Sequence, residues 1–293
     1  MKAFTSVPKE TGLTAARFHA EYLRPERPVI IADACVGRAY DLWSPEYFCR
    51  IAPDLAVPIK EYGPSGIRQS KMTLKAYAAF LREHERAPRP RGQALPYCHD
   101  IPIFALLPRL VEDVQPFPAG LLSSYYQPAW WRYVQFFMGP AHSLTPLHFD
   151  TLLTHNLFFQ VYGKKRFTIY APDDAAYCGR RSWRWFTHDP EQPDYQSLPH
   201  SRQATPYEVV VGPGDILYLP PGTLHHVRGL GTSISFNIDF HTRRSALRSL
   251  LGPLRGMPRQ SFYYNALATL GIVGRVPEEW VFRYYKPYLS YVV

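Results

Sequence analysis

The sequence predicts a mainly β protein whose centre is a sandwich or jelly roll, with helices before and after it. Over residues 132–241, short apolar runs alternate with glycine and proline turns, as in strands that pack into a sandwich or barrel. Proline makes up 29 of 293 residues, about twice the usual share of roughly 5%, which disfavours a long helical bundle. After residue 242, Leu247, Leu250, Leu251 and Leu254 recur at helical spacing.

The first 128 residues are expected to alternate between helices and strands. Ser44 fits the N-cap of a helix that Pro45 opens, because serine caps free backbone N–H groups and proline suits the first turn. Residues 84–96 are charged and rich in proline, so we expect them to be exposed. The elements expected before residue 128 are a helix at 14–23, a strand at 27–34, the helix from Pro45, a strand at 56–62 and a helix at 74–83 that starts at Thr73.

The centre of the chain contains short runs rich in β-branched and aromatic residues, separated by glycine and proline turn signals. The expected strands lie in RYVQFF, LTPLHFD, NLFFQVYG, RFTIYAP, YEVVVGPGDILYLPPG, HHVRG and SISFNIDF. Beyond them, FYYNALATLGIV and PEEWVFRYYKPYLSY are expected to be helices. We therefore expect a β-rich domain with its N-terminal helices over residues 1–242 and a helical extension over residues 243–293, without a linker between them.

The chain is basic, with a formal net charge of +9 and a sequence pI near 9.3. Such a charge could favour nucleic acid or another acidic partner. The alternative is arginine scattered over the surface, because the two basic clusters, at 82–92 and 179–184, both have the composition of loops. The charge alone does not separate these interpretations.

Cysteine usage and hydropathy predict a cytoplasmic protein. The four cysteines show no zinc-binding spacing, which favours reduced thiols; they are Cys35, Cys49, Cys98 and Cys178. The N-terminus lacks the apolar stretch of a signal peptide. The sequence has no run of about 18 apolar residues, so we expect no membrane span.

The segment TPLHFD places a histidine and an aspartate one residue apart on an expected strand. Side chains alternate along a strand, so His148 and Asp150 should point to the same side. A hydrogen-bonded pair is the simpler explanation, but a candidate third ligand follows where another strand opens with His225 and His226. Two histidines and one carboxylate form the facial triad of non-haem Fe(II) oxygenases. The pattern therefore indicates a metal site with positions left open for a co-substrate and oxygen.

These residues resemble the JmjC-type, cupin-fold oxygenases that depend on Fe(II) and 2-oxoglutarate. More narrowly, they resemble the small JmjC-only hydroxylases, such as the asparaginyl hydroxylase of hypoxia-inducible factor. The resemblance is closest over residues 130–241, where the family's TPxHxD segment is matched at 145–150 and its distal histidine, five residues after a proline, by His225. It implies a double-stranded β-helix, or jelly roll, with Fe(II) held by His148, Asp150 and His225.

The resemblance also implies a binding site for 2-oxoglutarate. Lys165, two residues after Gly163, matches the family's lysine for the far carboxylate. Strand alternation supports this choice, because Lys165 shares a face with Phe167 and Ile169, where a lysine is costly unless it meets an anion. The alternative is an edge lysine that extends to water. The other positions matched to co-substrate or supporting residues of the family are Thr145, Asn156, Asn237 and Tyr97.

Other polar and aromatic residues have simpler explanations. Asp215 in GPGD is expected to serve a turn before a strand. Four tryptophans could be packing aromatics as readily as substrate contacts: Trp130, Trp131, Trp183 and Trp185. Three histidines have no partner at ligand spacing and are expected at the surface: His155, His188 and His200.

Together with the resemblance, the sequence predicts a dioxygenase that hydroxylates an amino-acid side chain, in a peptide or protein. The alternatives are the same chemistry on a small molecule or on nucleic acid, demethylation of methyl-lysine, and a metal-binding cupin module without catalysis. Residues 151–155 and 178–205 flank the site, carry aromatic and basic side chains, and could line a peptide groove. The resembling hydroxylases form homodimers through C-terminal helices, so we expect residues 243–293 to be a dimerisation element.

Overall fold

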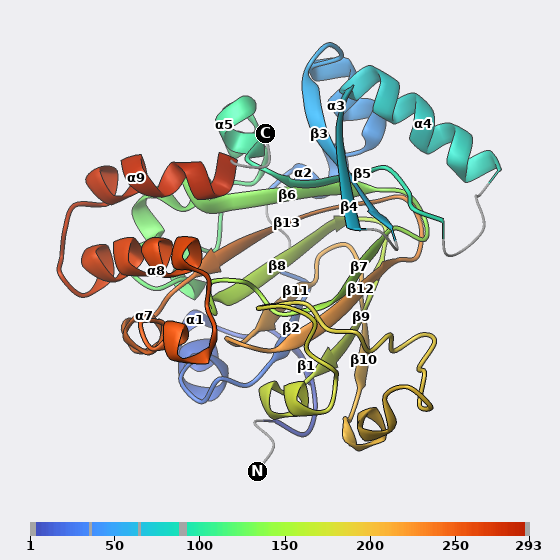
Figure 1. The fold of residues 1–293 in the computed structure, drawn as a ribbon. Coiled ribbons are helices and arrows are strands. Elements are labelled where there is room, and N and C mark those ends of the chain that lie inside the picture. The colour runs from blue at the N-terminus through green and yellow to red at the C-terminus, as the bar shows by residue number, and fades with distance from the viewer. Residues whose placement is uncertain (1–3, 35–36, 64–65, 88–92, 291–293) are drawn as a thin grey trace.

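Two β-sheets face each other across an apolar interior, and helices cover the outer face of the larger sheet (Figure 1). This computed structural model describes residues 4–34, 37–63, 66–87 and 93–290. The two sheets form a jelly roll, or double-stranded β-helix, flanked by N-terminal and C-terminal helices. The predicted fold class is therefore confirmed.

The larger sheet has nine strands in the order β1-β2-β11-β8-β13-β6-β5-β3-β4. In chain order they are β1 Lys9–Thr11, β2 Val29–Ala32, β3 Ala56–Gly63, β4 Gly66–Thr73, β5 Tyr97–Ile101, β6 Val134–Gly139, β8 His155–Tyr162, β11 Ile216–Leu219 and β13 Ser233–Phe240. The smaller sheet has the order β10-β9-β12-β7. Its strands are β7 Leu144–His148, β9 Lys165–Tyr170, β10 Tyr207–Val211 and β12 Leu224–Gly229. β1 and β2 are parallel, and the other paired strands are antiparallel.

The helices lie mainly before β6 and after β13. The helical elements before β6 are α1 Ala15–Phe18, η1 His19–Leu23, α2 Ala39–Leu42, α3 Pro45–Ile51, α4 Leu74–Arg86, α5 Ile103–Leu106, α6 Leu110–Asp113, η2 Ala119–Leu121 and η3 Gln127–Tyr133. The later ones are η4 Pro172–Ala176, η5 Pro199–Gln203, α7 Arg243–Ser249, η6 Gly252–Arg255, α8 Arg259–Ile272 and α9 Glu278–Ser290.

The predicted N-terminal elements are present, and the capping residues explain where their helices begin. The side chains of Ser44 and Thr73 accept hydrogen bonds from backbone N–H groups in the first turns of α3 and α4. However, α4 continues to Arg86, so the start of the segment predicted to be an exposed loop is helical, and residues 88–92 lie outside the described residues. β4 is not predicted, because its sequence GIRQSKMT is polar and mostly exposed and lacks apolar alternation.

The larger sheet buries side chains on both faces. On the outer face, the rings of Phe136 and Phe236 each lie 6.0 Å from Trp43, which precedes α3. On the inner face, Phe158 of β8 lies 5.0 Å from Phe167 of the smaller sheet. Two-sided burial explains why β8 and β13 are nearly continuous runs of buried residues. The space between the sheets also contains the polar side chains of the candidate site.

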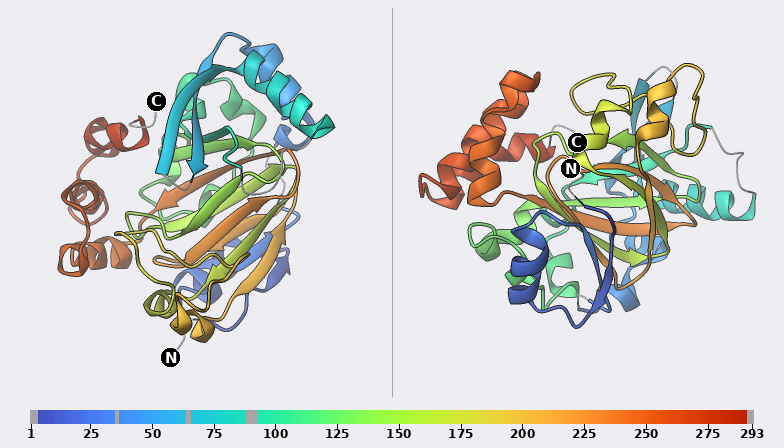
Figure 2. Two further views of the ribbon diagram at one scale, coloured as in Figure 1. Left: turned by 45° about the vertical axis from the view of Figure 1, so that its right-hand side comes forward. Right: turned by 90° about the horizontal axis from the view of Figure 1, so that it is seen from below.

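The C-terminal helices form a layer beside the two sheets, shown in orange and red in Figure 2. Tyr285 of α9 packs on Tyr133, with ring centroids 5.8 Å apart, and belongs to the main apolar core. In contrast, Leu251 and Leu254 are 54% and 85% exposed, and Trp280 is 48% exposed. The apolar side chains of the C-terminal helices are therefore divided between the protein's own core and its surface.

Two predictions about histidines are wrong. His155 is buried, with Nδ1 2.8 Å from the hydroxyl of Tyr218, and His188 is buried with Nε2 3.0 Å from the hydroxyl of Tyr170. These partners are 63 and 18 residues away in the chain, so local ligand spacing carries no information about them. His200 is exposed, as predicted.

The remaining structural predictions concern cysteines, the turn aspartate and membrane spans. Cys49, Cys98 and Cys178 are free thiols, and Cys35 lies outside the described residues. Asp215 accepts a hydrogen bond from the backbone N–H of Gly212, which confirms its role in the turn before β11. Within the part of the chain that the structure describes, every helix is too short or too polar to cross a membrane.

Candidate metal and co-substrate site

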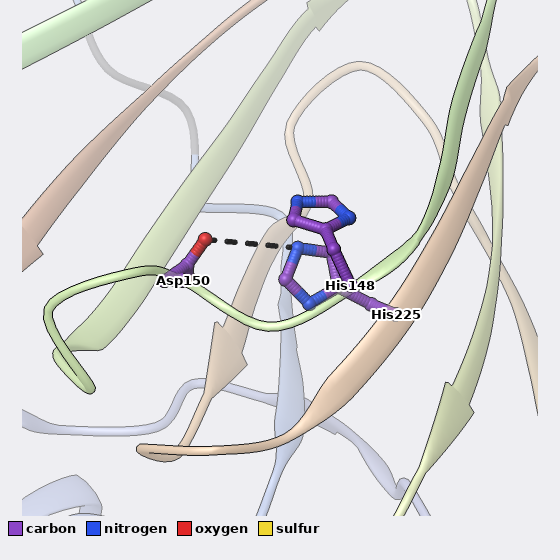
Figure 3. A group of neighbouring side chains, drawn as sticks. All are labelled: His148, Asp150 and His225. Carbon is purple, nitrogen blue, oxygen red and sulfur yellow. Dashed lines mark ion pairs between the residues drawn. The ribbon is translucent and has the colours of Figure 1, made fainter. Parts of the chain in front are cut away.

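Three candidate metal ligands meet at the end of the smaller sheet (Figure 3). His148 ends β7, Asp150 follows it by two residues, and His225 lies on β12 directly opposite His148. One ligand atom from each of the three residues lies within 4.8 Å of the other two, and Nε2 of His225 is 3.8 Å from Oδ1 of Asp150. Antiparallel pairing of β7 with β12 thus brings together residues from distant parts of the sequence.

Strand alternation does not explain the direction of Asp150, which corrects one step of the sequence prediction. β7 ends at His148, and residues 149 and 150 lie outside regular structure. The backbone then turns, because the N–H of Leu153 donates to the carbonyl of Asp150 at 2.8 Å. The turn, rather than a regular strand, directs this carboxylate toward the two imidazoles.

Backbone carbonyls fix which nitrogen each imidazole offers to a ligand. Nδ1 of His148 lies 2.8 Å from the carbonyl of Pro146, and Nδ1 of His225 lies 3.2 Å from that of Thr223. An Nδ1–H donated to a carbonyl leaves Nε2 unprotonated and available to a metal. Burial, and then the neighbouring His225, lowers the pKa of His148 well below its usual value, which favours the neutral, ligating form.

The second histidine of the HH pair points elsewhere. His226 is buried on the other side of β12, where its Nε2 lies 3.8 Å from a carboxylate oxygen of Glu191. Alternation along β12 separates the two neighbouring imidazoles in this way. The geometry therefore favours His225 over His226 as the candidate ligand.

Lys165 lies on the wall of the cavity that also contains the three ligands. Its side chain is 1% exposed, and Nζ donates hydrogen bonds to the hydroxyls of Tyr97 and Ser235, both at 2.8 Å. The rings of Phe137 and Phe158 lie 5.2 and 5.1 Å from Nζ. Burial lowers the pKa of Lys165 to about 7. Because an ammonium has three donors, one remains for an anion in the cavity.

A carboxylate that the sequence prediction missed organises the two predicted asparagines. Nδ2 of Asn156 donates to Oδ2 of Asp150 at 3.2 Å and to Oδ1 of Asp239 at 2.9 Å. Nδ2 of Asn237 also donates to Oδ1 of Asp239, at 3.2 Å. Burial, and then Asp150, raises the pKa of Asp239 well above its usual value. Alternation along β13 could have identified Asp239, since it shares a face with Asn237.

Thr145 lies on the cavity wall beside a residue that the sequence prediction also missed. Its Oγ1 is 3.3 Å from Nε2 of His99, and both residues are buried. His99 follows Tyr97 by two residues on β5. The predicted role of Tyr97 could therefore have pointed to His99 as a second cavity residue. All five predicted co-substrate residues, Lys165, Thr145, Asn156, Asn237 and Tyr97, line this one cavity.

Part of the predicted substrate segment, residues 178–205, packs over the triad. Trp185 forms an isolated bridge with His148, and its ring lies 4.9 Å from the imidazole. The carboxylate of Glu191 anchors this segment to the smaller sheet, because it accepts hydrogen bonds from Arg166 of β9 and Arg228 of β12. Of the four tryptophans, Trp185 is thus placed at the site.

The other three tryptophans differ in their surroundings. Trp130 is buried and stacks on Phe117 at 3.7 Å, while Trp131 is partly exposed. Nε1 of Trp183 donates to the backbone carbonyl of Thr151, which links the two segments expected to flank the site. Trp130 is therefore a packing residue, and Trp183 holds a loop.

The donor set fits a divalent transition metal. Two imidazoles and one carboxylate correspond to the facial arrangement that binds non-haem Fe(II) and leaves further positions open. Asn156 holds the second oxygen of Asp150, which leaves Oδ1 directed toward His225. Such outer contacts orient metal ligands. The side chains of this cavity can therefore hold a metal at one end and an anion at Lys165.

Comparison with known proteins identifies the family. Residues 15–246 match the cupin-like domain family. The chain belongs to this family. The match covers every strand except β1 and the metal and co-substrate residues, and it ends inside α7, so α8 and α9 lie beyond the cupin-like region.

Some of the relatives that the chain matches carry Jumonji C or JMJD names. The chain is 28% identical over 200 residues to Jumonji C domain-containing protein 5 of Drosophila melanogaster, which covers 66% of this chain and 48% of that protein. It is 25% identical over 253 residues to lysine-specific demethylase 8 of Xenopus tropicalis, covering 80% and 52%. It is 23% identical over 255 residues to 2-oxoglutarate and iron-dependent oxygenase JMJD4 of Gallus gallus, covering 79% and 59%.

These relatives confirm the JmjC-type resemblance seen in the sequence. The chain spans about half the length of the relatives it matches. Their names therefore describe longer proteins, and what each binds or acts on is a property of that protein.

Proposed function

We propose that this cupin-like protein is an Fe(II)- and 2-oxoglutarate-dependent oxygenase that hydroxylates an amino-acid side chain in a peptide or protein. The observation that carries the proposal is one cavity that contains both the His148–Asp150–His225 cluster and the buried ammonium of Lys165. A metal-binding module without catalysis has no use for this second feature, because a buried lysine is costly without an anion.

Each cavity residue has a role that follows from its contacts. His148, Asp150 and His225 would hold the iron, and Lys165 with Thr145 would bind the far carboxylate of 2-oxoglutarate. When bound, iron and 2-oxoglutarate would supply oxidation by O2, in which one oxygen atom goes to a C–H bond of the substrate and the other to 2-oxoglutarate, which leaves as succinate and carbon dioxide. The protein's own contribution is to orient both groups and to limit access of water to the cavity.

A second hollow beside the triad supports a polypeptide substrate. It has a volume of about 660 Å³ and lies between the β3–β4 hairpin, β7 and the segment with Trp185. Ile67, Leu144 and Phe186 give it an apolar surface, and Arg181 and Asp189 add charges of both signs. Because Trp185 also packs on His148, the hollow adjoins the candidate metal site. A mixed apolar and charged groove suits an extended peptide.

The test is incubation of the protein with Fe(II), 2-oxoglutarate and candidate peptides, followed by intact-mass and fragment-ion spectra. A gain of one oxygen on one side chain would support hydroxylation. Loss of a methyl group with release of formaldehyde would favour demethylation, the activity for which lysine-specific demethylase 8 of Xenopus tropicalis is named. Turnover only on small molecules or nucleic acid would contradict the peptide proposal and leave the oxygenase proposal intact.

We also propose a cytoplasmic homodimer that associates through the C-terminal helices. The exposed apolar side chains of Leu251, Leu254, Trp280 and Tyr284 support this assembly. The free thiols of Cys49, Cys98 and Cys178 are compatible with a reducing compartment.

A further inference from the structure

A buried polar chain runs from β3 through β5 to the wall of the site cavity. Nζ of Lys60 donates to Oδ2 of Asp100 at 2.6 Å, and the same oxygen lies 2.9 Å from Nδ1 of His99. Lys60 and His99 are 5% and 7% exposed. A buried ion pair carries a large desolvation cost and is weak evidence for stability alone. The position of this chain beside Thr145 suggests a use in the site.

The backbone of β5 is irregular where this chain reaches the cavity. The pairing of β5 with β6 shifts register between Cys98 and Ile101, and Asp100 has a φ of 60°. As a result His99 and Asp100, which are neighbours in sequence, both line the cavity, although regular alternation would separate them. Such irregularities next to active sites re-aim side chains. The bulge therefore serves to place His99 and its carboxylate partner together.

The charge of Asp100 favours one position for the proton of His99. The Asp100 carboxylate oxygen 2.9 Å from Nδ1 favours a proton on that nitrogen by charge, although the contact lacks hydrogen-bond geometry, so Nε2 is left as an acceptor with a single lone pair. Burial lowers the pKa of His99 to about 4, so the ring is neutral at pH 7. Two hydroxyls lie 3.3 Å from this acceptor, those of Thr145 and Tyr62. One lone pair can serve only one of them well.

We propose that His99 is a positioning residue for the co-substrate, because its Nε2 can accept from the hydroxyl of Thr145 or of Tyr62 but not from both. When Tyr62 donates to His99, the proton of Thr145 is free to bind a carboxylate held by Lys165. Without the Tyr62 hydroxyl, Nε2 of His99 has only Thr145 as a donor. Thr145 can then bind the anion only by leaving this buried nitrogen without a hydrogen bond. Tyr62 thus strengthens anion binding through His99 without touching the anion. The inference rests on the proposed function, which assigns Lys165 and Thr145 to 2-oxoglutarate.

The test is a double-mutant cycle on 2-oxoglutarate affinity, measured by calorimetry on the full chain loaded with Mn(II), so that the readout is binding and not turnover. Tyr62→Phe and Thr145→Val each remove one hydroxyl and keep the side-chain shape. We expect each to weaken binding roughly tenfold, the effect of one unsatisfied buried acceptor or one lost charge-assisted bond. The double variant should bind no more weakly than Thr145→Val alone, because Tyr62 has no effect once the Thr145 hydroxyl is absent.

The controls separate this inference from the proposed function. Tyr263→Phe, an exposed tyrosine on α8, should leave the affinity unchanged. An unchanged affinity in Tyr62→Phe, with weakened binding in Thr145→Val and Lys165→Ala, would overturn the role of His99 alone. Additive weakening in the double variant would also overturn it, because Tyr62 would then contact the anion directly. Unchanged affinity in Lys165→Ala and Thr145→Val would overturn the proposed function, and the inference with it.

Discussion

At the scale of single residues, two neighbouring histidines provide a sensitive test of the metal site. His225 faces His148 and Asp150, while His226 faces Glu191 on the other side of β12. We therefore expect His225→Ala to lose a bound divalent metal and His226→Ala to keep it. Metal content after dialysis against trace Fe(II) or Mn(II), measured by mass spectrometry, distinguishes them. Retention in His225→Ala with loss in His226→Ala would show that the assignment is off by one residue.

Two adjacent lysines test the anion site in the same way. Lys165→Ala should weaken 2-oxoglutarate binding at least about tenfold, because it removes a charge-assisted hydrogen bond worth roughly 1.5–3 kcal/mol. Lys164 is exposed in the turn before β9 and is the matched control, so Lys164→Ala should leave the affinity almost unchanged. Equal affinities in the two variants would contradict the assignment of Lys165.

The lowered pKa of Lys165 makes 2-oxoglutarate binding dependent on pH. The free protein loses the ammonium as pH rises through about 7, but the anion needs it, so binding takes up a proton above that pH. The apparent affinity should fall by up to about tenfold per pH unit between roughly pH 7 and 9. Lys165→Arg stays charged and should remove most of this dependence. Calorimetry across this pH range measures the affinity of the wild type and of Lys165→Arg. A wild-type affinity that does not change with pH would contradict the lowered pKa of Lys165.

The sequence could predict the residues of the site that belong to a linear pattern. His148, Asp150 and Lys165 each stand in a short segment whose residue types carry the chemistry. Asp239 and His99 stand two residues from the predicted Asn237 and Tyr97, so strand alternation could place them on the same faces, but it could not reveal their contacts with residues 83 and 46 positions away. Only the paired strands bring them to the cavity.

At the scale of elements, Glu191 holds the segment 178–205 onto the smaller sheet. Its carboxylate bonds to Arg166 and Arg228, and Arg228 is 8% exposed. Glu191→Gln should lower the free energy of unfolding by about 1.5–3 kcal/mol at pH 7, the worth of hydrogen bonds to a charged group. Chemical denaturation measures the difference in the free energy of unfolding. Glu208→Gln, at an exposed position of β10, is the control and should leave it almost unchanged.

This difference between the Glu191 variant and wild type should depend on pH. Neighbouring His226, Arg228 and Arg166 hold the pKa of Glu191 well below its usual value. A lowered folded-state pKa contributes stability that is present above the unfolded value of about 4.3 and is lost as pH falls below it. The deficit of the variant should therefore shrink below about pH 4. A deficit that stays constant to pH 3 would contradict the ion-pair role of Glu191.

Elements with a strong local signal were predictable, and those defined by tertiary pairing were not. The helix starts at Pro45 and after Thr73 follow from capping side chains. β4 has a polar sequence and forms because it pairs with β3 along its whole length. The end of β7 before Asp150 depends on the turn that follows, which apolar alternation does not reveal.

At the scale of the whole molecule, the C-terminal helices serve both the site and the surface. Tyr288 of α9 lines the cavity, while Trp280 on the same helix is half exposed. We expect a dimer in light scattering at micromolar concentration, and Trp280→Glu should shift it toward the monomer. Leu230→Glu, on an exposed turn before β13, is the control. A monomer for the unmodified chain would remove the assembly proposal without affecting the site.

The central claim is that iron and 2-oxoglutarate act together in the cavity of His148, Asp150, His225 and Lys165. The most direct measurement is proton NMR of 2-oxoglutarate and succinate in air, with Fe(II), a peptide pool from digested cell extract, and either wild type or Asp150→Ala. We predict that succinate accumulates beyond the amount of protein with wild type and stays at background with the variant. Background succinate with a metal-loaded wild type, or equal turnover by both proteins, would contradict the claim.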